Sequence, residues 1–504
     1  MRARRAALVL AAFALASAGC QRPKGRCDAS VDCASGERCD AGVCVRVHVP
    51  PVVGDGSGGG TDPTSFTPVA WSVLVTDPSA SLAPVSVGAD AASDDVLVAG
   101  VVEGRYDPWS LGTGGFAAHL SGDAGALLPP PVPFPTFTGG ALRAVPLAGG
   151  GLLFAGRAEV RTLLGTYDIV PPSAGMLVLG QLGAGGDPVW IHTVAGTAAA
   201  FEIAPVAVAS RGGDLVVAGA GAGDFGCLTG DTGGATFAAV LSGADGQCLW
   251  SRGFANRTVS DAEALATGEV ALAGACTPTA ASFDLGDGTT CARGMFVALL
   301  DAADGHTLWS RTSSGTGTVS AVRDVAVAPG GAVAVVGDAR GSVAFGGATP
   351  VDFGTQDGSF VKIFTATGGA GPLIRPVEAP TAPLPDLVAF DRAAFDASAR
   401  LWIAGRYYGQ PTLAGVRFSS CRDACTLAAF LARVDSPLAT PATGSFLPVR
   451  VADAAGGAAW VDDLVLAATT GSVSWALRFS GDATVGTTRW TTAAAGLGVV
   501  RIVP

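Results

Sequence analysis

The sequence predicts an all-β protein, a seven-bladed β-propeller of four-stranded blades of about 60 residues, preceded by a small disulfide-rich module. Three observations predict this fold class. A tryptophan recurs at one position of a long repeat, and short β-rich runs that end in Ala-Gly or a close variant recur along the chain. The third is composition: 72 of the 504 residues are glycine, without a collagen period, which is typical of many strands joined by tight turns.

Residues 1–19 are expected to form a secretory signal peptide. Arg2, Arg4 and Arg5 supply a positively charged start, and the run from Ala6 to Ala18 is apolar and uncharged. That run is too short to cross a bilayer comfortably, and no later segment is both long and apolar enough to do so. The sequence therefore predicts export, with attachment to a membrane only through a lipid.

The predicted lipid attachment site is Cys20. Ser17-Ala18-Gly19-Cys20 resembles the lipobox of bacterial lipoproteins, which usually have Leu where this chain has Ser17. The resemblance implies that Cys20 is diacylated and becomes the N-terminus, and that Gln21, not being Asp, directs the protein to the outer membrane or cell surface. Ordinary cleavage after Ala18, which would give a periplasmic or secreted protein, is the alternative. Cysteine parity favours lipidation, because removing Cys20 from the eleven cysteines leaves an even number that can pair.

Residues 20–48 combine the anchor site with a cysteine-rich module, and residues 49–67 form a linker rich in Pro, Gly and Ser. The closely spaced cysteines of an exported module indicate two disulfides, in any of three connectivities. A zinc site is the alternative, but the CxxC pairs that usually supply its ligands are absent. The pattern resembles short Cys-rich modules of myxobacterial surface lipoproteins. The cysteines of the module are Cys27, Cys33, Cys39 and Cys44.

Residues 68–504 are expected to form the propeller. Five of its nine tryptophans mark one position of the repeat; they are separated by 119, 60, 59 and 181 residues, which fits multiples of one period near sixty and gives seven periods in all. The runs that end in Ala-Gly or a variant also number seven. The tryptophans are Trp71, Trp190, Trp250, Trp309 and Trp490, and the runs end at Gly100, Gly156, Gly219, Gly274, Gly337, Gly405 and Ala468.

Each repeat is expected to contain four antiparallel strands. Val325–Ala328 and Val333–Val336, joined by a Pro-Gly-Gly turn, represent the first two strands. Phe296–Leu300 represents the third, and an Asp-Gly turn leads to the fourth at Leu308–Trp309. Four strands per unit without a helical period favour propeller blades over a sandwich.

Both ends of the propeller contain a candidate for the last strand of the seventh blade. Trp71 and Trp490 both match the last strand of a blade, and only one of them can complete the seventh blade. A strand from the opposite end of the chain would remove sheet edges and tie the termini together. The sequence leaves open which end closes the ring.

From about Ala70 to the C-terminus the repeats resemble the bacterial β-propeller repeat family of secreted and surface proteins. The strands Gly294–Asp301 and Leu308–Arg311 carry this resemblance, which implies an architecture and no particular activity. A weaker resemblance is to quinoprotein-like propellers, whose docking motif places Asp, Gly and Trp four residues apart. The match is Asp301, Gly305 and Trp309, and most other repeats lack the Asp. This second resemblance implies a scaffold lipoprotein of the kind that assists outer-membrane barrel assembly.

The sequence contains no recognisable catalytic constellation, so we expect no enzyme, no cofactor and no metal. The four histidines lack metal-ligand spacing, and there is no GxSxG elbow, phosphate-binding glycine loop or adjacent cysteine pair of the quinoprotein alcohol dehydrogenases. The net charge of −11 and the pI near 4.8 also disfavour nucleic acid as a partner. The histidines are His48, His119, His192 and His306.

The propeller's own cysteines are expected to be structural. Two pairs each lie around one long interstrand loop and can staple it, which leaves the remaining two cysteines to pair with each other. A free reactive thiol is the alternative. The expected pairs are Cys276 with Cys291, Cys421 with Cys425, and Cys227 with Cys248.

The long loops, such as Asp338–Asp357, are expected on the face where the chain crosses between blades, and loops on a rigid frame usually carry binding residues. We therefore expect a non-catalytic, surface-displayed lipoprotein whose propeller binds an unidentified protein or glycan on that face. An outer-membrane assembly lipoprotein is one alternative. The other is a carbohydrate-active enzyme, which would need paired carboxylates near the central channel. The candidate binding residues, which can also be ordinary loop residues, are Arg340, Arg406, Tyr407 and Tyr408.

Overall fold

A computed structural model describes residues 37–40, 43–46 and 69–503 of the chain, the last range with gaps. The predicted signal peptide, Cys20 and the linker lie outside the described residues, as do Cys27, Cys33, Cys421 and Cys425. The gaps are 76–79, 90–94, 106–112, 127, 129–131, 135–136, 138–141, 148, 173–174, 197–203, 222, 228–235, 255–256, 277–282, 292, 377–386, 409–411, 414–415, 418–427, 439–443, 453–459, 469–471 and 486–487.

The chain divides into two compact units. In the first, β1 (Glu37–Asp40) and β2 (Val43–Arg46) form an antiparallel hairpin in which Cys39 lies opposite Cys44. The second unit is the propeller. Among the described residues there is no helix long and apolar enough to span a membrane.

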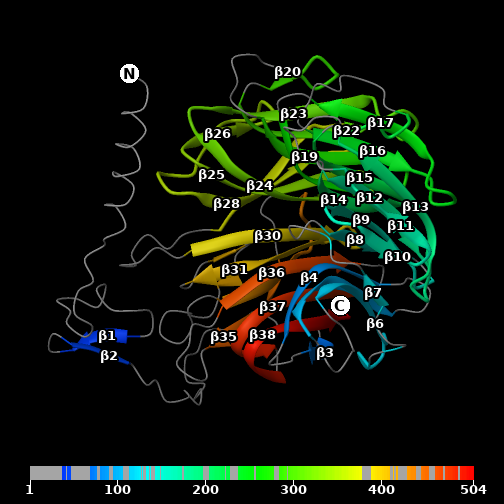
Figure 1. Cartoon of the computed structure of the whole chain (residues 1–504). Helices are drawn as coiled ribbons and strands as arrows, with labels where there is room; N and C mark the ends of the chain where they lie inside the picture. The colour runs from blue at the N-terminus through cyan, green and yellow to red at the C-terminus, as the bar shows by residue number, and fades with distance from the viewer. Residues whose placement is uncertain are drawn as a thin grey trace, which may run out of the picture. The chain divides into compact units, whose positions relative to one another are not determined.

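The second unit confirms the predicted fold class: it is an all-β, seven-bladed propeller (Figure 1). Each blade is an antiparallel sheet of four strands that runs from the centre outwards. In order, the blades are β4 (Ala80–Ala89), β5 (Val96–Gly104), β6 (Gly114–Leu120), β7 (Val132–Phe134); β8 (Arg143–Pro146), β9 (Leu152–Ala158), β12 (Met176–Leu182), β13 (Pro188–Ala195); β14 (Ala204–Arg211), β15 (Asp214–Ala220), β16 (Thr236–Leu241), β17 (Cys248–Phe254); β18 (Arg257–Ala264), β19 (Val270–Cys276), β22 (Gly294–Leu300), β23 (Thr307–Gly315); β24 (Thr318–Val327), β25 (Val333–Arg340), β28 (Gly358–Phe364), β29 (Ala370–Ile374); β30 (Leu387–Phe395), β31 (Leu401–Tyr408), β34 (Ala428–Val434), β35 (Gly444–Ala452); and β36 (Trp460–Ala468), β37 (Val473–Val485), β38 (Thr488–Ile502), β3 (Val69–Val75).

Short two-stranded ribbons lie in the loops between the second and third strands of four blades. One strand of these ribbons, β26, also pairs with the end of β23 in the preceding blade. The ribbons are β10 (Thr162–Leu164) with β11 (Tyr167–Ile169), β20 (Phe283–Asp284) with β21 (Thr290–Cys291), β26 (Ser342–Phe345) with β27 (Val351–Asp352), and β32 (Thr412–Leu413) with β33 (Val416–Arg417).

The N-terminal end of the propeller closes the ring. Strand β3, which contains Trp71, pairs antiparallel with β38 and forms the outer strand of the seventh blade (Figure 1, where blue β3 lies beside red β38). Trp490 lies within β38 itself, opposite Ala483 of β37, and its ring stacks on Phe479. The prediction that Trp490 marks the same position as the other tryptophans is therefore wrong, because β37 and β38 continue past the blade as a long hairpin.

A glycine opposite a phenylalanine explains most of the recurring Ala-Gly runs. In five blades a glycine of the second strand pairs with a phenylalanine of the third. At Gly100, Gly274, Gly337 and Gly405 an added Cβ would lie less than 3.0 Å from the ring. Blade 2 exchanges the two roles. Ala468 lies in the first strand of blade 7, so it is not equivalent to the other six positions. The five pairs are Gly100–Phe116, Gly219–Phe237, Gly274–Phe296, Gly337–Phe360 and Gly405–Phe430.

The apolar core lies between neighbouring blades. Both faces of the middle strands are covered, so these strands are apolar along nearly their whole length. Val333 and Val335 of β25 belong to a cluster with Leu299 of blade 4. Val336 belongs to another cluster, with Phe390 of blade 6. Burial on both faces gives a rigid frame around the centre of the ring.

At the outer rim, a tryptophan of one blade docks on the Asp-Gly turn of the next. Nε1 of Trp250 donates to the Ala302 carbonyl at 3.2 Å, and Arg252 donates to the Gly305 carbonyl at 2.8 Å. A Cβ at Gly305 would lie 2.6 Å from the Trp250 ring, and its φ of +70° also favours glycine. Trp190 covers Gly246 and Trp309 covers Gly368 in the same way.

Two disulfides join the predicted partners within the described residues. Cys276–Cys291 spans the loop between β19 and β22, and Cys227–Cys248 ties a loop to the start of β17. The Cα atoms are 6.0 and 5.7 Å apart, which is an ordinary separation for a disulfide. Each bond therefore holds a long loop against its own blade.

Candidate binding site in the central cavity

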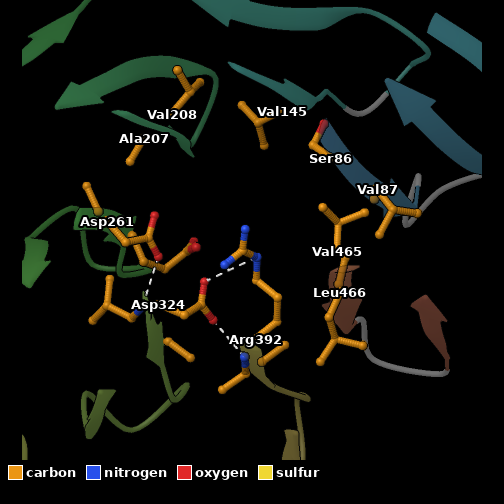
Figure 2. A pocket seen from close by; sticks show the side chains of 18 of the residues that line it. Ser86, Val87, Val145, Ala207, Val208, Asp261, Asp324, Arg392, Val465 and Leu466 are labelled. Atoms are coloured by element: carbon orange, nitrogen blue, oxygen red, sulfur yellow. Dashed lines mark hydrogen bonds and ion pairs between the residues drawn. The ribbon is translucent and has the colours of Figure 1, made fainter. Parts of the chain in front are cut away.

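The first strands of all seven blades surround a cavity of about 440 Å³ at the centre of the ring (Figure 2). This volume lies in the range of small-molecule sites, which is roughly 300–1,000 Å³. Because each wall segment is the inner strand of a packed blade, the cavity is formed by the frame itself and not by loops. The lining strands are β4, β8, β14, β18, β24, β30 and β36.

A shift of register in the first strands sets which residues form the cavity wall. In six of these strands the pairing with the second strand skips one residue, or two in β36. The residue after the skip pairs with the position next to the glycine or its equivalent. Such bulges redirect side chains. In β8 the equivalent position is Arg143. One layer around the cavity thus contains Ser86, Arg143, Ala207, Asp261, Asp324, Arg392 and Val465.

Three of these residues, on adjacent blades, form the polar side of the cavity. The backbone N–H of Val325 donates to Oδ2 of Asp261 at 2.8 Å, and that of Ala393 donates to Oδ2 of Asp324 at 2.6 Å. Each aspartate therefore bonds to the first strand of the next blade. Nε of Arg392 lies 3.9 Å from Oδ1 of Asp324, and Figure 2 shows the guanidinium reaching into the cavity between the blades.

Glu263 adds a third carboxyl group to the same side. It lies two residues after Asp261 on β18 and also lines the cavity. Burial, helped by the negative charge of Asp261, raises the pKa of Glu263 from its usual 4.5 to about 8. Glu263 is therefore a neutral hydrogen-bond donor at pH 7.

Asp261 and Asp324 titrate as a pair. Burial raises the pKa of Asp324 well above its usual range, and the charge of Asp261 raises it further. Burial also raises the pKa of Asp261, against the opposing effect of its hydrogen bond from Val325. The two carboxyl groups contact each other across the blades, so the charge of one opposes ionisation of the other.

The opposite side of the cavity is mostly apolar. Val87, Val145, Val465 and Leu466 line it, across from the aspartates in Figure 2. Arg143, the cation on this side, donates through Nε to the Val206 carbonyl at 2.7 Å. The cavity thus has one polar wall and one largely apolar wall.

A charged network lies behind the polar wall. Arg323, which lines the cavity, binds Asp338 through a hydrogen-bonded ion pair and lies 3.8 Å from Asp391. Asp391 in turn accepts two hydrogen bonds from Arg406, at 2.9 and 2.8 Å. Ser359 donates to the other oxygen of Asp338 at 2.5 Å. These contacts link blades 5 and 6 and fix the backbone next to Asp324 and Arg392.

The four binding residues predicted from the sequence do not form one surface. Arg340 is exposed at the end of β25, whereas Arg406 is held by Asp391 between β30 and β31. Tyr407 is 0% exposed and packs near Phe430, so it belongs to the core and not to the loop face. Tyr408 is partly buried. The alternation of side chains along β31 puts Arg406 and Tyr407 on opposite faces of the sheet, which separates them.

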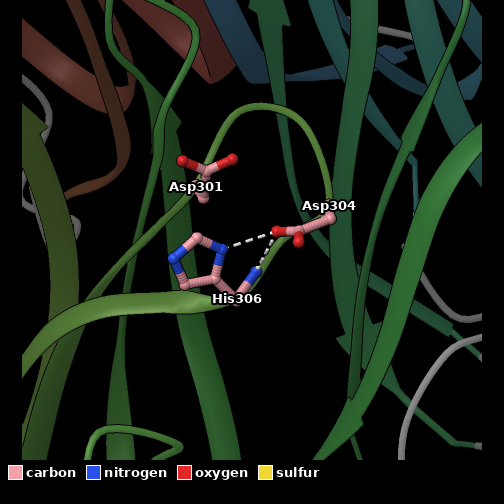
Figure 3. Close-up of side chains that lie close together, drawn as sticks. All are labelled: Asp301, Asp304 and His306. Atoms are coloured by element: carbon pink, nitrogen blue, oxygen red, sulfur yellow. Dashed lines mark hydrogen bonds and ion pairs between the residues drawn. The ribbon is translucent and has the colours of Figure 1, made fainter.

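Asp301, Asp304 and His306 form a second group that could contact an ion, in the turn between β22 and β23 (Figure 3). Their ligand atoms lie within 4.8 Å of one another. Oδ1 of Asp304 accepts the His306 backbone N–H at 3.0 Å and lies 2.7 Å from Nδ1 of the same residue. Oδ1 of Asp301 accepts the Ala303 N–H at 2.7 Å. These contacts shape the turn that receives Trp250. The turn therefore explains why the three residues lie together, and no bound ion is needed.

The sequence analysis missed the polar wall of the cavity. Its signal was an acidic or basic residue inside the first strand of three successive repeats, at Asp261, Asp324 and Arg392. First strands are innermost in a propeller, so a charged residue within one indicates the channel. Glu263, alternating with Asp261 along β18, belongs to the same pattern.

No protein-family model matches the chain, and no curated protein matches it in sequence. Solved β-propellers resemble it in structure. The polysaccharide lyase Uly1 is 10% identical, with a TM-score of 0.46 over 87% of this chain and 100% of that one. A quinohemoprotein alcohol dehydrogenase of Pseudomonas putida HK5 is 9% identical, with a TM-score of 0.40 over 88% and 77%. BamB of Moraxella catarrhalis is 12% identical, with a TM-score of 0.35 over 71% and 96%. Similarity this distant says nothing about the function of this chain.

Proposed function

We propose that this chain is a non-catalytic ligand-binding propeller displayed at the bacterial cell envelope, with its ligand site in the central cavity. The observation that supports this proposal is a ligand-sized cavity with charged groups in its wall. Asp324 is only 8% exposed, and placing a carboxyl group there costs free energy that an apolar residue would not cost. A function in binding explains why the polar group is in the cavity wall.

Export and anchoring form part of the proposal. Disulfides such as Cys227–Cys248 and Cys276–Cys291 persist in oxidising compartments, which supports an exported protein. Lipidation at Cys20 would hold it at the outer membrane or cell surface. The loop face that carries Arg340 can then contact a protein or glycan partner while the cavity holds a small ligand.

A carbohydrate-active enzyme is the second candidate, and the paired carboxyl groups of Asp261 and Asp324 favour it. Glycoside cleavage uses one protonated and one ionised carboxyl group near the scissile bond. The same two aspartates also join blades through backbone amides, so their pairing has a structural reason as well. For that reason we place binding before catalysis. A lipoprotein that assists outer-membrane assembly remains a further alternative.

Thermal unfolding in the presence of a metabolite and glycan library tests the cavity. The chain from Gln21 onward, with its disulfides formed, is compared with Asp324→Asn and with Asp396→Asn as a control. Both aspartates are buried, but only Asp324 lines the cavity, whereas Asp396 binds Arg400 and Trp402 in the turn between β30 and β31. We expect compounds that raise the Tm of the parent chain and of Asp396→Asn but not of Asp324→Asn. Equal effects on the two variants would contradict a site in the cavity.

Two further measurements separate the alternatives. Substrate turnover by the purified chain, abolished by Asp324→Asn, would favour the enzyme. Capture of barrel-assembly components from crosslinked envelopes would favour the assembly lipoprotein. Cys20→Ala tests the anchor, because we expect it to move the protein from the detergent phase to the aqueous phase. A parent chain already in the aqueous phase would contradict lipidation.

A further inference from the structure

Acidic and basic groups lie side by side on the polar wall. Nε of Arg392 lies 3.9 Å from Oδ1 of Asp324, and Asp261 and Glu263 line the same side of the cavity. A cation placed here would meet Arg392, and an anion would meet three carboxyl groups. An uncharged ligand avoids both repulsions.

The same wall is rich in hydrogen-bonding groups of both kinds. A protonated carboxyl group donates one hydrogen bond and accepts others, whereas a guanidinium only donates. Asp261 and Asp324 each accept a backbone N–H at Oδ2, and both line the cavity as hydrogen-bond acceptors. Glu263 contributes both a donor and an acceptor. Hydroxyl groups, which donate and accept at the same atom, suit this mixture best.

The opposite wall requires an apolar surface on the same ligand. Val87, Val145, Val465 and Leu466 offer carbon atoms and no hydrogen bonds from their side chains. A pyranose ring has hydroxyl groups around its edge and C–H groups on its faces, so it can satisfy both walls at once. The cavity of about 440 Å³ accommodates a small ligand of this kind.

We propose that the cavity ligand is an uncharged saccharide, bound through hydroxyl groups by Asp261, Asp324, Glu263 and Arg392 with its apolar face against the valine wall. The inference rests on the proposed function, since it names the ligand class of the same site. It goes further by predicting that uncharged sugars bind more tightly than amines, carboxylates or phosphates.

The proposal also implies a pH dependence. Glu263 donates a hydrogen bond only while it is protonated, and Asp261, Asp324 and Arg392 face it on the same side of the cavity, with Arg143 and Arg323 further along the wall. Raising the pH from 6 to 9 ionises Glu263 and adds a negative charge beside the aspartate pair. Saccharide binding should then weaken about tenfold or more, as expected when a buried donor is lost.

Isothermal titration calorimetry with defined probes tests the inference. The probes are glucose, galactose, N-acetylglucosamine and cellobiose as uncharged sugars, glucosamine as a cation, and glucuronate and glucose 6-phosphate as anions. The parent chain is titrated at pH 6 and pH 9, with Glu263→Gln and the control Asp396→Asn, whose carboxyl group is buried but does not line the cavity. We expect binding of at least one uncharged sugar at pH 6, weakened at pH 9. Glu263→Gln should bind equally at both pH values, because its amide donates a hydrogen bond at either pH.

Each other outcome identifies what has failed. Tight binding of glucosamine or of the anions, with no uncharged sugar bound, would overturn the saccharide and leave the cavity as a binding site. Binding that Asp396→Asn weakens as much as Glu263→Gln would overturn the assignment of Glu263. If no probe binds the folded chain and the compound library also gives no Tm shift, both the inference and the proposed function fail.

Discussion

The outer rim of the propeller and the wall of its central cavity both join one blade to the next, but they do so differently. At the rim, Trp250 and Trp309 make nearly the same contacts, each covering a glycine and donating to a backbone carbonyl of the next blade. At the cavity wall the equivalent positions range from Ala207 to Asp324 and Arg392. The same contact recurs at the rim, whereas the residue types of the cavity wall differ from blade to blade.

This difference separates the two tasks of the molecule. The tryptophan contacts recur at the rim because Trp190, Trp250 and Trp309 each meet the same kind of turn in the next blade. The cavity wall has no such common neighbour, so its residues differ from blade to blade. Asp261 and Asp324 do both, since each bonds to the next blade and also faces the cavity. The following predictions test the comparison, beginning with the largest expected effect.

At the rim, Gly305→Val should lower the free energy of unfolding by about 4 kcal/mol, because it combines backbone strain at positive φ with a clash against Trp250. The control is Gly212→Val, since Gly212 has a φ of +60° but nothing within 4 Å of the added Cβ. It should cost about 2 kcal/mol. Urea unfolding followed by tryptophan fluorescence measures both. Equal losses of unfolding free energy in the two variants would show that the contact between Trp250 and Gly305 contributes little to stability.

Removing a disulfide should lower the free energy of unfolding less than disrupting the contact between Trp250 and Gly305. Replacing Cys276 and Cys291 together by Ser should destabilise the chain by about 3 kcal/mol, the value expected for a closed loop of this length. The same experiment on Cys227 and Cys248 provides the comparison, with a sequence separation of 21 in place of 15. Thermal unfolding under non-reducing conditions measures the loss. A double variant as stable as the parent chain would contradict a structural role.

At the cavity wall, Glu263→Gln should stabilise the chain at pH 9 by about 2 kcal/mol and have little effect at pH 5. Because the pKa of Glu263 is raised in the folded state, the unfolded chain loses its proton first, and stability falls as pH rises from about 4.5 to about 8. The amide removes this dependence. Denaturant midpoints at a series of pH values measure it, with exposed Glu103→Gln as the control. If the stability of the parent chain depends on pH in the same way as that of Glu263→Gln, ionisation of Glu263 does not destabilise the chain.

The smallest effect is expected for Trp309→Phe, a loss of about 1 kcal/mol. The phenyl ring can still cover Gly368, but the hydrogen bond from Nε1 to the Ala366 carbonyl at 2.9 Å is lost. Trp309→Ala should cost several times more, because it also uncovers the glycine. Equilibrium unfolding of the two variants separates ring packing from the hydrogen bond. If both lose the same amount, packing does not contribute.

The rim could be predicted from the sequence because its contacts depend on residues at fixed spacing within the repeat. Trp250, the Asp-Gly turn and the cysteine pair Cys276–Cys291 are all visible in this way. Closure of the ring was ambiguous, because Trp71 and Trp490 match the same motif and only β3 pairs in the fourth position.

The cavity wall could not be predicted in the same way. Bulges in the first strands decide which residue faces the centre, and a one-residue change of register exchanges the two faces. Arg406 and Tyr407 show the same limit, because their adjacency in sequence suggested one surface while the strand directs them to opposite sides. Pairing of Asp261 with Asp324 depends on contact between blades more than sixty residues apart.

Closure of the ring by β3 also has a consequence for folding. Val73, near the start of the propeller, pairs with Val499 of β38, so the last blade cannot form until β38 has been synthesised. Contacts of such high sequence separation slow folding and leave strand edges open in the meantime. Pairing of β3 with β38 is therefore possible only after all seven blades have been synthesised. A chain cut short before β38 would leave β3 unpaired and exposed to proteases, which gives the cell a simple means of removing unfinished copies.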